Sequence, residues 1–260
     1  MECRSLDHTA LADDVRSILD TALDDAGLTG PLFLAGNPAI LCQPRVAAVG
    51  TREPAPWTLS AIEGLAASLA SLGACLVSGG AVGTDCAAHS GALHAGGATV
   101  VVAPCPLEDI SLSSWRSALS GRWDLARTLF LSPFPRGTRP RRGHPLVRNR
   151  LIATLATAGV VGATGLTGGT NHFIRLALDR RMPLFFLDSR PEDPVLRQAL
   201  ETLHLRGAVP FSEDEALEAR ALSAKVLAAA ASFERRVREQ GSAQLRWCED
   251  EAEYLTGGSN

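Results

Sequence analysis

Short apolar runs alternate with helical stretches along most of this chain, and this alternation constrains the fold more than any single motif does. The runs are almost entirely apolar and lie at 45–50, 74–77, 98–103, 128–132, 159–163 and 183–188. Helical patterns follow them at 54–72, 84–95, 114–127, 146–158, 170–181 and 193–205. Strands that are apolar throughout, each followed by a helix, are typical of a parallel sheet covered on both faces. We therefore expect an α/β fold with a mostly parallel sheet.

Both ends of the chain differ from this central pattern. Apolar residues recur at helical spacing over 9–24, so we expect 1–30 to form an N-terminal helical segment. A short strand and turn at 31–37 then opens the main domain, 31–212. Residues 216–237 form one Ala-rich helical pattern, and the following stretch is polar and ends in glycines. We expect 213–260 to be a C-terminal helix and a mobile tail.

Composition points to a cytoplasmic protein. Of the 260 residues, 46% are hydrophobic and 20% are charged, which is ordinary for a globular domain. The chain has neither a signal-peptide pattern at its start nor an apolar run of about 18 residues, so we expect no membrane association. The six cysteines are scattered without a C-x-x-C pair, which favours reduced thiols over a disulfide framework.

A glycine-rich turn joins the run at 74–77 to the next helical stretch. Its candidate ligand-binding residues are Ser78, Gly79, Gly80, Gly83 and Thr84. Glycines let the backbone come close to a ligand, and the free N–H groups of the following helix can hold a phosphate. The turn matches neither a Walker motif nor G-x-G-x-x-G, so a tight turn capped by Thr84 and without a ligand is the alternative.

Two more loops follow predicted strands with similar residues. The first is Gly50-Thr51-Arg52, and the second contains Gly168, Gly169 and Thr170. Ligands of parallel α/β sheets bind at the carboxyl ends of the strands, so several such loops indicate a nucleotide or phosphate site. Arg52 offers a planar fork for a phosphate. Its alternative role is a surface ion pair with Glu53 or another carboxylate.

A basic segment at 136–150 contains six arginines, one histidine and no acid. Its prolines and glycines keep it extended, so its charges can line a phosphate backbone, although a solvated loop is the alternative. Nearby aromatic residues can stack on bases or pack in the core: Trp115, Trp123, Phe130 and Phe134. The candidate binding residues of this segment are Arg139, Arg141, Arg142, Arg148, Asn149 and Arg150. Of Arg148 and Arg150, we expect one to reach the groove and the other to brace the loop.

Charge is unevenly distributed, while groups suited to catalysis are few. Residues 45–190 contain fifteen arginines and eight acids between two acidic ends, which favours a polyanionic ligand. Cys86 and His89 share a helix face but have no evident orienting carboxylate, so a buried thiol is the favoured interpretation. The histidines lack metal-ligand spacing. We therefore expect a non-enzymatic binder without a metal or cofactor.

Taken together, the loops resemble the DNA-processing protein A (DprA, or Smf) family. The matching residues run from Gly36-Asn37 through Val46–Arg52, Ser78–His89 and Gly96-Gly97 to Arg148-Asn149-Arg150. The resemblance implies an extended Rossmann-like domain that binds single-stranded DNA, loads RecA on it and acts as a homodimer in natural transformation or DNA uptake. It also implies that Arg52, the Ser78–Gly83 turn and Arg148–Arg150 line the DNA groove.

The chain departs from the family pattern in places, and two other functions stay open. Val161-Gly162-Ala163 lacks the usual acid, and the usual winged-helix module is not readable in 213–260. A cytosolic binder or sensor of a small nucleotide is the main alternative. A nucleotide–ribose hydrolase is the weaker one, because Gly168-Gly169-Thr170 lacks the next glycine and the glutamate of a related enzyme family.

Overall fold

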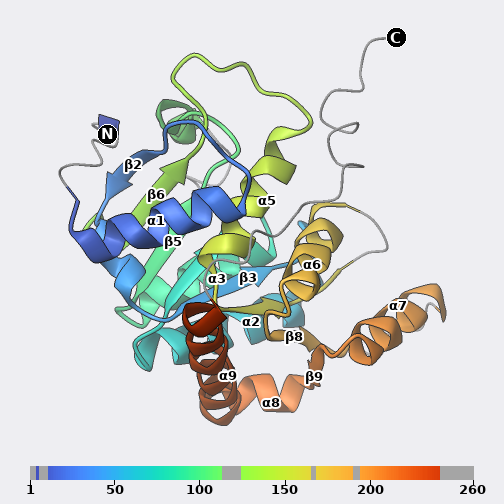
Figure 1. Cartoon of the computed structure of the whole chain (residues 1–260). Helices are drawn as coiled ribbons and strands as arrows, with labels where there is room; N and C mark the ends of the chain where they lie inside the picture. The colour runs from blue at the N-terminus through green and yellow to red at the C-terminus, as the bar shows by residue number, and fades with distance from the viewer. Residues whose placement is uncertain (1–3, 6–10, 113–123, 165–167, 190–193, 241–260) are drawn as a thin grey trace.

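A central sheet with helices on both faces forms the molecule (Figure 1). The computed structural model describes residues 4–5, 11–112, 124–164, 168–189 and 194–240. Within these residues the sheet has nine strands in the order β1-β2-β6-β5-β4-β3-β7-β8-β9. The pairs β1–β2 and β2–β6 are antiparallel, and the other pairs are parallel. The expected α/β fold with a mostly parallel, Rossmann-like sheet is confirmed.

The strands follow the apolar runs closely, because a strand buried on both faces is mostly apolar along its whole length. Their bounds are β1 Arg4–Ser5, β2 Phe33–Gly36, β3 Arg45–Val49, β4 Cys75–Ser78, β5 Ala98–Val102, β6 Thr128–Ser132, β7 Ala158–Val161, β8 Leu184–Leu187 and β9 Val209–Phe211. Every residue of β3 to β8 is buried. The sequence did not predict β1 or β9, which are very short strands at the two edges of the sheet.

Most helices lie between strands in the chain, and α8 and α9 follow the last strand. Their bounds are α1 Asp13–Asp25, α2 Pro56–Ser71, α3 Thr84–His94, α5 His144–Leu155, α6 Gly169–Asp179, α7 Pro194–Leu205, α8 Glu213–Leu217 and α9 Ala219–Gln240, with 3₁₀ turns at Pro38–Cys42 and Leu107–Leu112. The side chains of α1, α5, α6 and α7 pack in one core cluster. Those of α2, α3, α8 and most of α9 pack in another, which includes the opposite side chains of β3 and β4.

Three expected helices differ from the structure. Most of the helix expected at 114–127 lies outside the described residues, and its end forms a turn held by Asp124, which accepts hydrogen bonds from Ala126 and Arg127. The helix expected to end at 158 ends at Leu155, because Ala156 is extended and the Thr157 N–H already donates to the Arg45 carbonyl of β3. The single C-terminal helix is two helices: Ser212 and Glu215 form a capping box that starts α8, and the backbone leaves helical geometry at Glu218, before α9 begins.

Both flanking helices are fixed to the central sheet. Leu19 of α1 lies in the core, and Asp25 forms a 2.9 Å ion pair with Arg180, just after α6. In α9, Phe233 is buried and Glu234 contacts Arg45 of β3 at 3.1 Å. The last turns of α9 therefore lie at the amino edge of the sheet. In the described part of the chain, no helix combines the length and hydropathy needed to cross a membrane.

Candidate functional site

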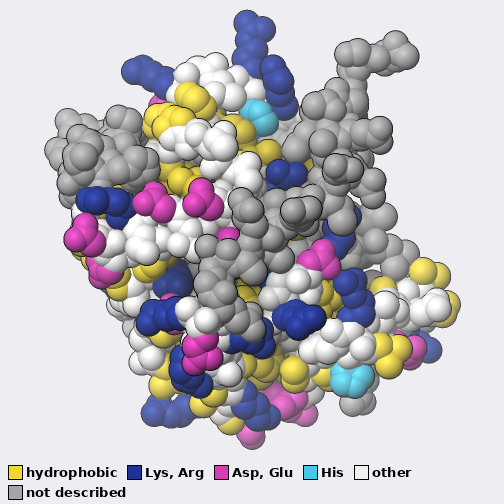
Figure 2. Space-filling model, in the orientation of Figure 1, with side chains coloured by type: hydrophobic (Ala, Val, Ile, Leu, Met, Phe, Trp, Pro, Cys, Tyr) yellow, Lys and Arg dark blue, Asp and Glu magenta, His cyan; other side chains and the backbone are white. Residues whose placement is uncertain are grey.

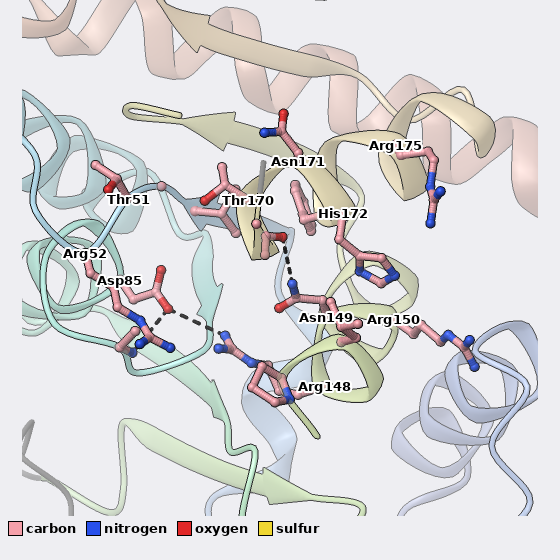
Figure 3. A pocket seen from close by; sticks show the side chains of 18 of the residues that line it. Thr51, Arg52, Asp85, Arg148, Asn149, Arg150, Thr170, Asn171, His172 and Arg175 are labelled. Atoms are coloured by element: carbon pink, nitrogen blue, oxygen red, sulfur yellow. Dashed lines mark hydrogen bonds and ion pairs between the residues drawn. The ribbon is translucent and has the colours of Figure 1, made fainter. Parts of the chain in front are cut away.

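A cavity of about 850 Å³ opens at the carboxyl edge of the sheet (Figure 3). The loop after β3, the turn before α3, and the first turns of α5 and α6 form its walls. Ligand pockets in proteins commonly measure about 300–1,000 Å³, and this edge is where parallel sheets place them. Position and size therefore both mark this cavity as the candidate site.

The lining of the cavity is strongly basic. It contains one carboxylate, Asp85, and five arginines: Arg52, Arg142, Arg148, Arg150 and Arg175. Further arginines project from the loop between β6 and α5, at the top of the molecule (Figures 1 and 2). A concave surface with one sign of charge attracts ligands of the opposite sign. The cavity is therefore suited to an anion with several charges.

Arg52 is an exposed cation on a fixed loop. Among the described residues its side chain has no ion pair or hydrogen bond, so the alternative role, a surface ion pair with Glu53 or another carboxylate, is not seen. The loop itself is held by Thr51, whose N–H donates to the Ala163 carbonyl at 2.9 Å and whose carbonyl accepts the Thr84 hydroxyl at 3.2 Å. A fixed backbone with an available guanidinium group is what a phosphate contact needs.

The glycine-rich turn before α3 holds groups of the protein itself. The Arg148 guanidinium fills the space beside Gly79 that a Cβ atom would take. Its Nη1 lies 3.5 Å from an oxygen of Asp85, and that oxygen also accepts the Ala81 N–H at 3.2 Å. Both side chains of this ion pair are more than nine-tenths buried. Arg148 therefore braces the turn. The Asp85 carboxylate accepts the hydrogen bond from the Ala81 N–H, which a bound anion would otherwise accept.

Burial controls the protonation states in this region. Burial raises the pKa of Asp85, and the nearby charge of Arg148 opposes this shift. Burial also lowers the pKa of Arg148; the charge of Asp85 opposes this shift, whereas the charge of Arg52 adds to it. Burial also lowers the pKa of His89 to about 3. Since Thr99 donates to the Leu76 carbonyl, its hydroxyl oxygen accepts from Nδ1 of a neutral His89 at 2.6 Å.

Cys86 and His89 do not form a nucleophile and a base. Burial raises the pKa of Cys86 to about 11, so its thiol stays protonated near neutral pH. The Nδ1 atom of His89 is committed to Thr99, and the ring is fully buried. No group of three metal-ligating side chains is found within the described ranges.

The turn before α6 faces the cavity. Gly168 has φ +102°, which favours glycine, and no side chain caps the helix that follows. The Asn149 side chain donates to the Gly169 carbonyl at 2.8 Å and so fixes the turn from α5 (Figure 3). The N–H groups of a first helical turn have no partner inside the helix. His172 and Arg175 lie farther along α6 and also line the cavity.

The structure brings together ten of the sequence-predicted residues. Those lining the cavity are Gly50, Thr51, Arg52, Arg142, Arg148, Asn149, Arg150, Gly168, Gly169 and Thr170. The others do not line it: Ser78, Gly79, Gly80, Gly83, Thr84, Arg139 and Arg141. Ser78 is fully buried, and its hydroxyl donates to the Ala48 carbonyl.

Some lining residues were not named as candidates by the sequence analysis. Asp85, Pro145, Leu146 and Asn171 belong to loops that it singled out, whereas His172 and Arg175 lie beyond them. Helical spacing from the predicted turn would have indicated His172 and Arg175, which are three residues apart and share a face of α6. The two aromatic candidates that the structure describes do not line the cavity. Phe130 is buried in the core, and Phe134 stacks on His144 with ring centroids 4.0 Å apart. Trp115 and Trp123 lie outside the described residues.

Comparison with known proteins identifies a family. The model of the family described as DNA recombination-mediator protein A matches residues 22–221. A putative DNA processing protein DprA of Mycobacterium tuberculosis is 43% identical over 143 residues, which cover 54% of this chain and 36% of that protein. Protein Smf of Synechocystis is 32% identical over 178 residues, or 67% of this chain and 43% of that protein. The chain thus spans about half or less of the length of these curated relatives.

Two solved structures of DNA processing protein A are similar to this chain. The structure of DNA processing protein A from Helicobacter pylori, described for its single-stranded DNA binding mode, has a TM-score of 0.67 and 27% identity, covering 84% of this chain and 95% of that one. The X-ray structure of DprA from Streptococcus pneumoniae has a TM-score of 0.64 and 26% identity, covering 84% of this chain and 73% of that one.

Proposed function

Because this chain belongs to the DNA recombination-mediator protein A family, we propose that it binds single-stranded DNA in the arginine-lined cavity. The binding serves DNA processing and recombination. The observation that carries this proposal is the charge of the cavity: five arginines line it, and its single carboxylate is already paired with one of them. This excess of arginines over carboxylates in the lining suits a polyanion, since phosphate contacts supply most of the affinity of non-specific DNA binding.

The cations lie on different sides of the cavity, which favours a strand over a mononucleotide. Figure 3 draws Arg52 on one side and Arg150 and Arg175 on the other, with the first turn of α6 between them. One phosphate can contact Arg52 while a neighbouring phosphate contacts the α6 side. Pro145 and Leu146 provide an apolar wall for sugars or bases. These contacts carry no base-specific code, so we expect little sequence preference.

We propose that the protein acts by binding and not by covalent chemistry. The buried thiol of Cys86 and the neutral His89 are unsuited to nucleophilic catalysis. Cytoplasmic location, a RecA-type recombinase as partner and a homodimer as the working form are further proposals that rest on the family. Light scattering on the purified protein tests the homodimer, and co-sedimentation with RecA on DNA tests the partner.

The direct test is a titration by fluorescence anisotropy with labelled oligo-dT, the matching duplex and a panel of labelled mononucleotides. We expect the single strand to bind most tightly and its affinity to fall steeply with salt, because phosphate contacts release counterions. Tight binding of one mononucleotide with no binding of oligo-dT would favour the small-nucleotide alternative. Failure to bind oligo-dT at low salt would contradict the proposal.

A further inference from the structure

The arginine-lined cavity and one segment of the same chain have opposite charges. Residues 241–260 follow α9 and lie outside the described residues. Their sequence contains one cation, Arg246, and four acids within five positions: Glu249, Asp250, Glu251 and Glu253. Blocks of acidic residues of this kind commonly serve as interaction segments. The cavity, whose lining holds five arginines and one carboxylate, is the matching surface.

We propose that the acidic segment 249–253 binds in the arginine-lined cavity when DNA is absent and competes with single-stranded DNA for it. This inference rests on the proposed function of the cavity. A carboxylate and a phosphate present the same paired oxygens to a guanidinium fork, so one set of arginines can hold either. Trp247 and Tyr254 flank the acids and can contact the apolar wall that Pro145 and Leu146 form.

The described end of the chain lies within reach of the cavity. Arg236, in the last turns of α9, donates to the Arg181 carbonyl at 2.7 Å, so α9 ends beside the far end of α6. The eleven residues of α6 span about 16 Å between that point and the cavity. Nine extended residues, from Gln240 to Glu249, reach up to about 30 Å. The acids can therefore reach Arg175 and Arg150 along the outer surface of α6.

Tethering makes even a weak contact effective. A binding segment joined to its site by a short linker acts at a local concentration in the millimolar range. If the segment alone binds with a Kd of about 0.2 mM, it weakens apparent DNA binding about five-fold. The competition is between two electrostatic contacts, so it should fade as salt screens both.

The test uses the full-length chain with Glu249→Gln, Asp250→Asn, Glu251→Gln and Glu253→Gln combined. The matched control combines Glu201→Gln, Glu213→Gln, Asp214→Asn and Glu218→Gln, which are exposed acids outside the cavity lining. Both variants change the net charge equally, so a long-range effect of net charge would appear in both. The readouts are the Kd for labelled oligo-dT at low and high salt, with a melting curve for each variant.

We expect the 249–253 variant to bind oligo-dT about 3- to 10-fold more tightly than wild type at low salt, and equally at 0.5 M salt. The control variant should gain much less. Equal affinities of wild type and the 249–253 variant, or equal gains in both variants, would overturn the inference. Equal gains would mean that the acids of 249–253 act only through the net charge of the protein.

A synthetic peptide of residues 241–260 separates this inference from the proposed function. Labelled peptide should bind the 249–253 variant measurably, and an Arg150→Ala, Arg175→Ala double substitution in that variant should abolish this binding. If no form of the protein binds oligo-dT but the peptide still binds at these arginines, the proposed function fails and the contact stands. If DNA binds and the peptide does not, only the inference fails.

Discussion

The turn before α3 and the turn before α6 both follow a buried parallel strand and both contain a glycine with positive φ, Gly83 at +86° and Gly168 at +102°. The turn before α3 is filled by the guanidinium of Arg148 and closed by the carboxylate of Asp85. The turn before α6 lines the open cavity. Two similar local sequences thus lead to one socket for the protein's own arginine and one surface for a ligand.

The difference arises from residues outside the turns. Arg148 comes from the first turns of α5, far from Gly79 in the sequence, and reaches the α3 turn because β4 and α5 are brought together by the sheet. Asn149, the next residue, reaches the α6 turn and donates to the Gly169 carbonyl there. Whether a glycine turn binds a ligand is therefore decided by which side chain the fold delivers to it.

The largest expected effect is on stability. Asp85→Ala leaves the buried Arg148 cation without its counter-charge and should reduce the free energy of unfolding by about 3–5 kcal/mol. Thr170→Ala, at the α6 turn, should change it by less than about 0.5 kcal/mol, since it removes no buried partner. Urea denaturation of both variants measures this contrast. Similar losses of unfolding free energy in the two variants would contradict the claim that, within the described residues, only the α3 turn of the two holds a buried ion pair.

Adding one methyl group to each turn sharpens the comparison. Gly79→Ala forces the Arg148 guanidinium out of its socket and should destabilise the protein by about 1–3 kcal/mol. Gly169→Ala is the control, because its Cβ would meet only the Asn149 amide at 3.4 Å. In an Arg148→Ala background the Gly79→Ala penalty should largely disappear, as a double-mutant cycle would reveal. A penalty that persists there would mean that Arg148 does not occupy the socket.

Acid should lower the free energy of unfolding through His89, which lies in α3. Its folded pKa of about 3 lies below the unfolded value of about 6.5, so the unfolded state binds the proton first and stability falls as pH drops through this range. Between pH 6.5 and pH 4.5 the expected loss is about 2 kcal/mol. His89→Met should flatten this part of the pH profile of urea unfolding. An unchanged profile would show that His89 is not the group responsible.

The smallest expected effect is a loss of DNA affinity when an arginine of α6 is removed. Arg175→Ala should weaken oligo-dT binding about five-fold, or about 1 kcal/mol, with the melting temperature unchanged. Arg220→Ala, an exposed arginine outside the cavity lining, makes the same change in net charge and should leave the Kd within about two-fold. Anisotropy titration measures both. Equal losses of affinity in Arg175→Ala and Arg220→Ala would mean that the location of Arg175 in the cavity does not contribute to DNA binding.

The sequence predicted the sheet well because its central strands are almost entirely apolar, a pattern that few other structures produce. It missed β9, which has three residues and contains Pro210. The three loops at the carboxyl edge could also be predicted, since chain order and strand direction determine where they meet. The occupant of the α3 turn could not, because no local pattern links Gly79 to Arg148. Arg175 was missed because the prediction stopped at the turn and did not follow the helix face.

The salt dependence of DNA binding by Arg52→Ala tests the central claim most directly. Each phosphate contact on single-stranded DNA contributes about 0.7 to the slope of log K against log salt. Arg52→Ala should therefore bind oligo-dT more weakly, with a slope shallower by about 0.7 and an unchanged melting temperature. Arg52→Lys should fall between wild type and Ala, because it keeps the charge and loses the fork. A slope equal to that of wild type for Arg52→Ala would contradict the claim that DNA phosphates bind in this cavity.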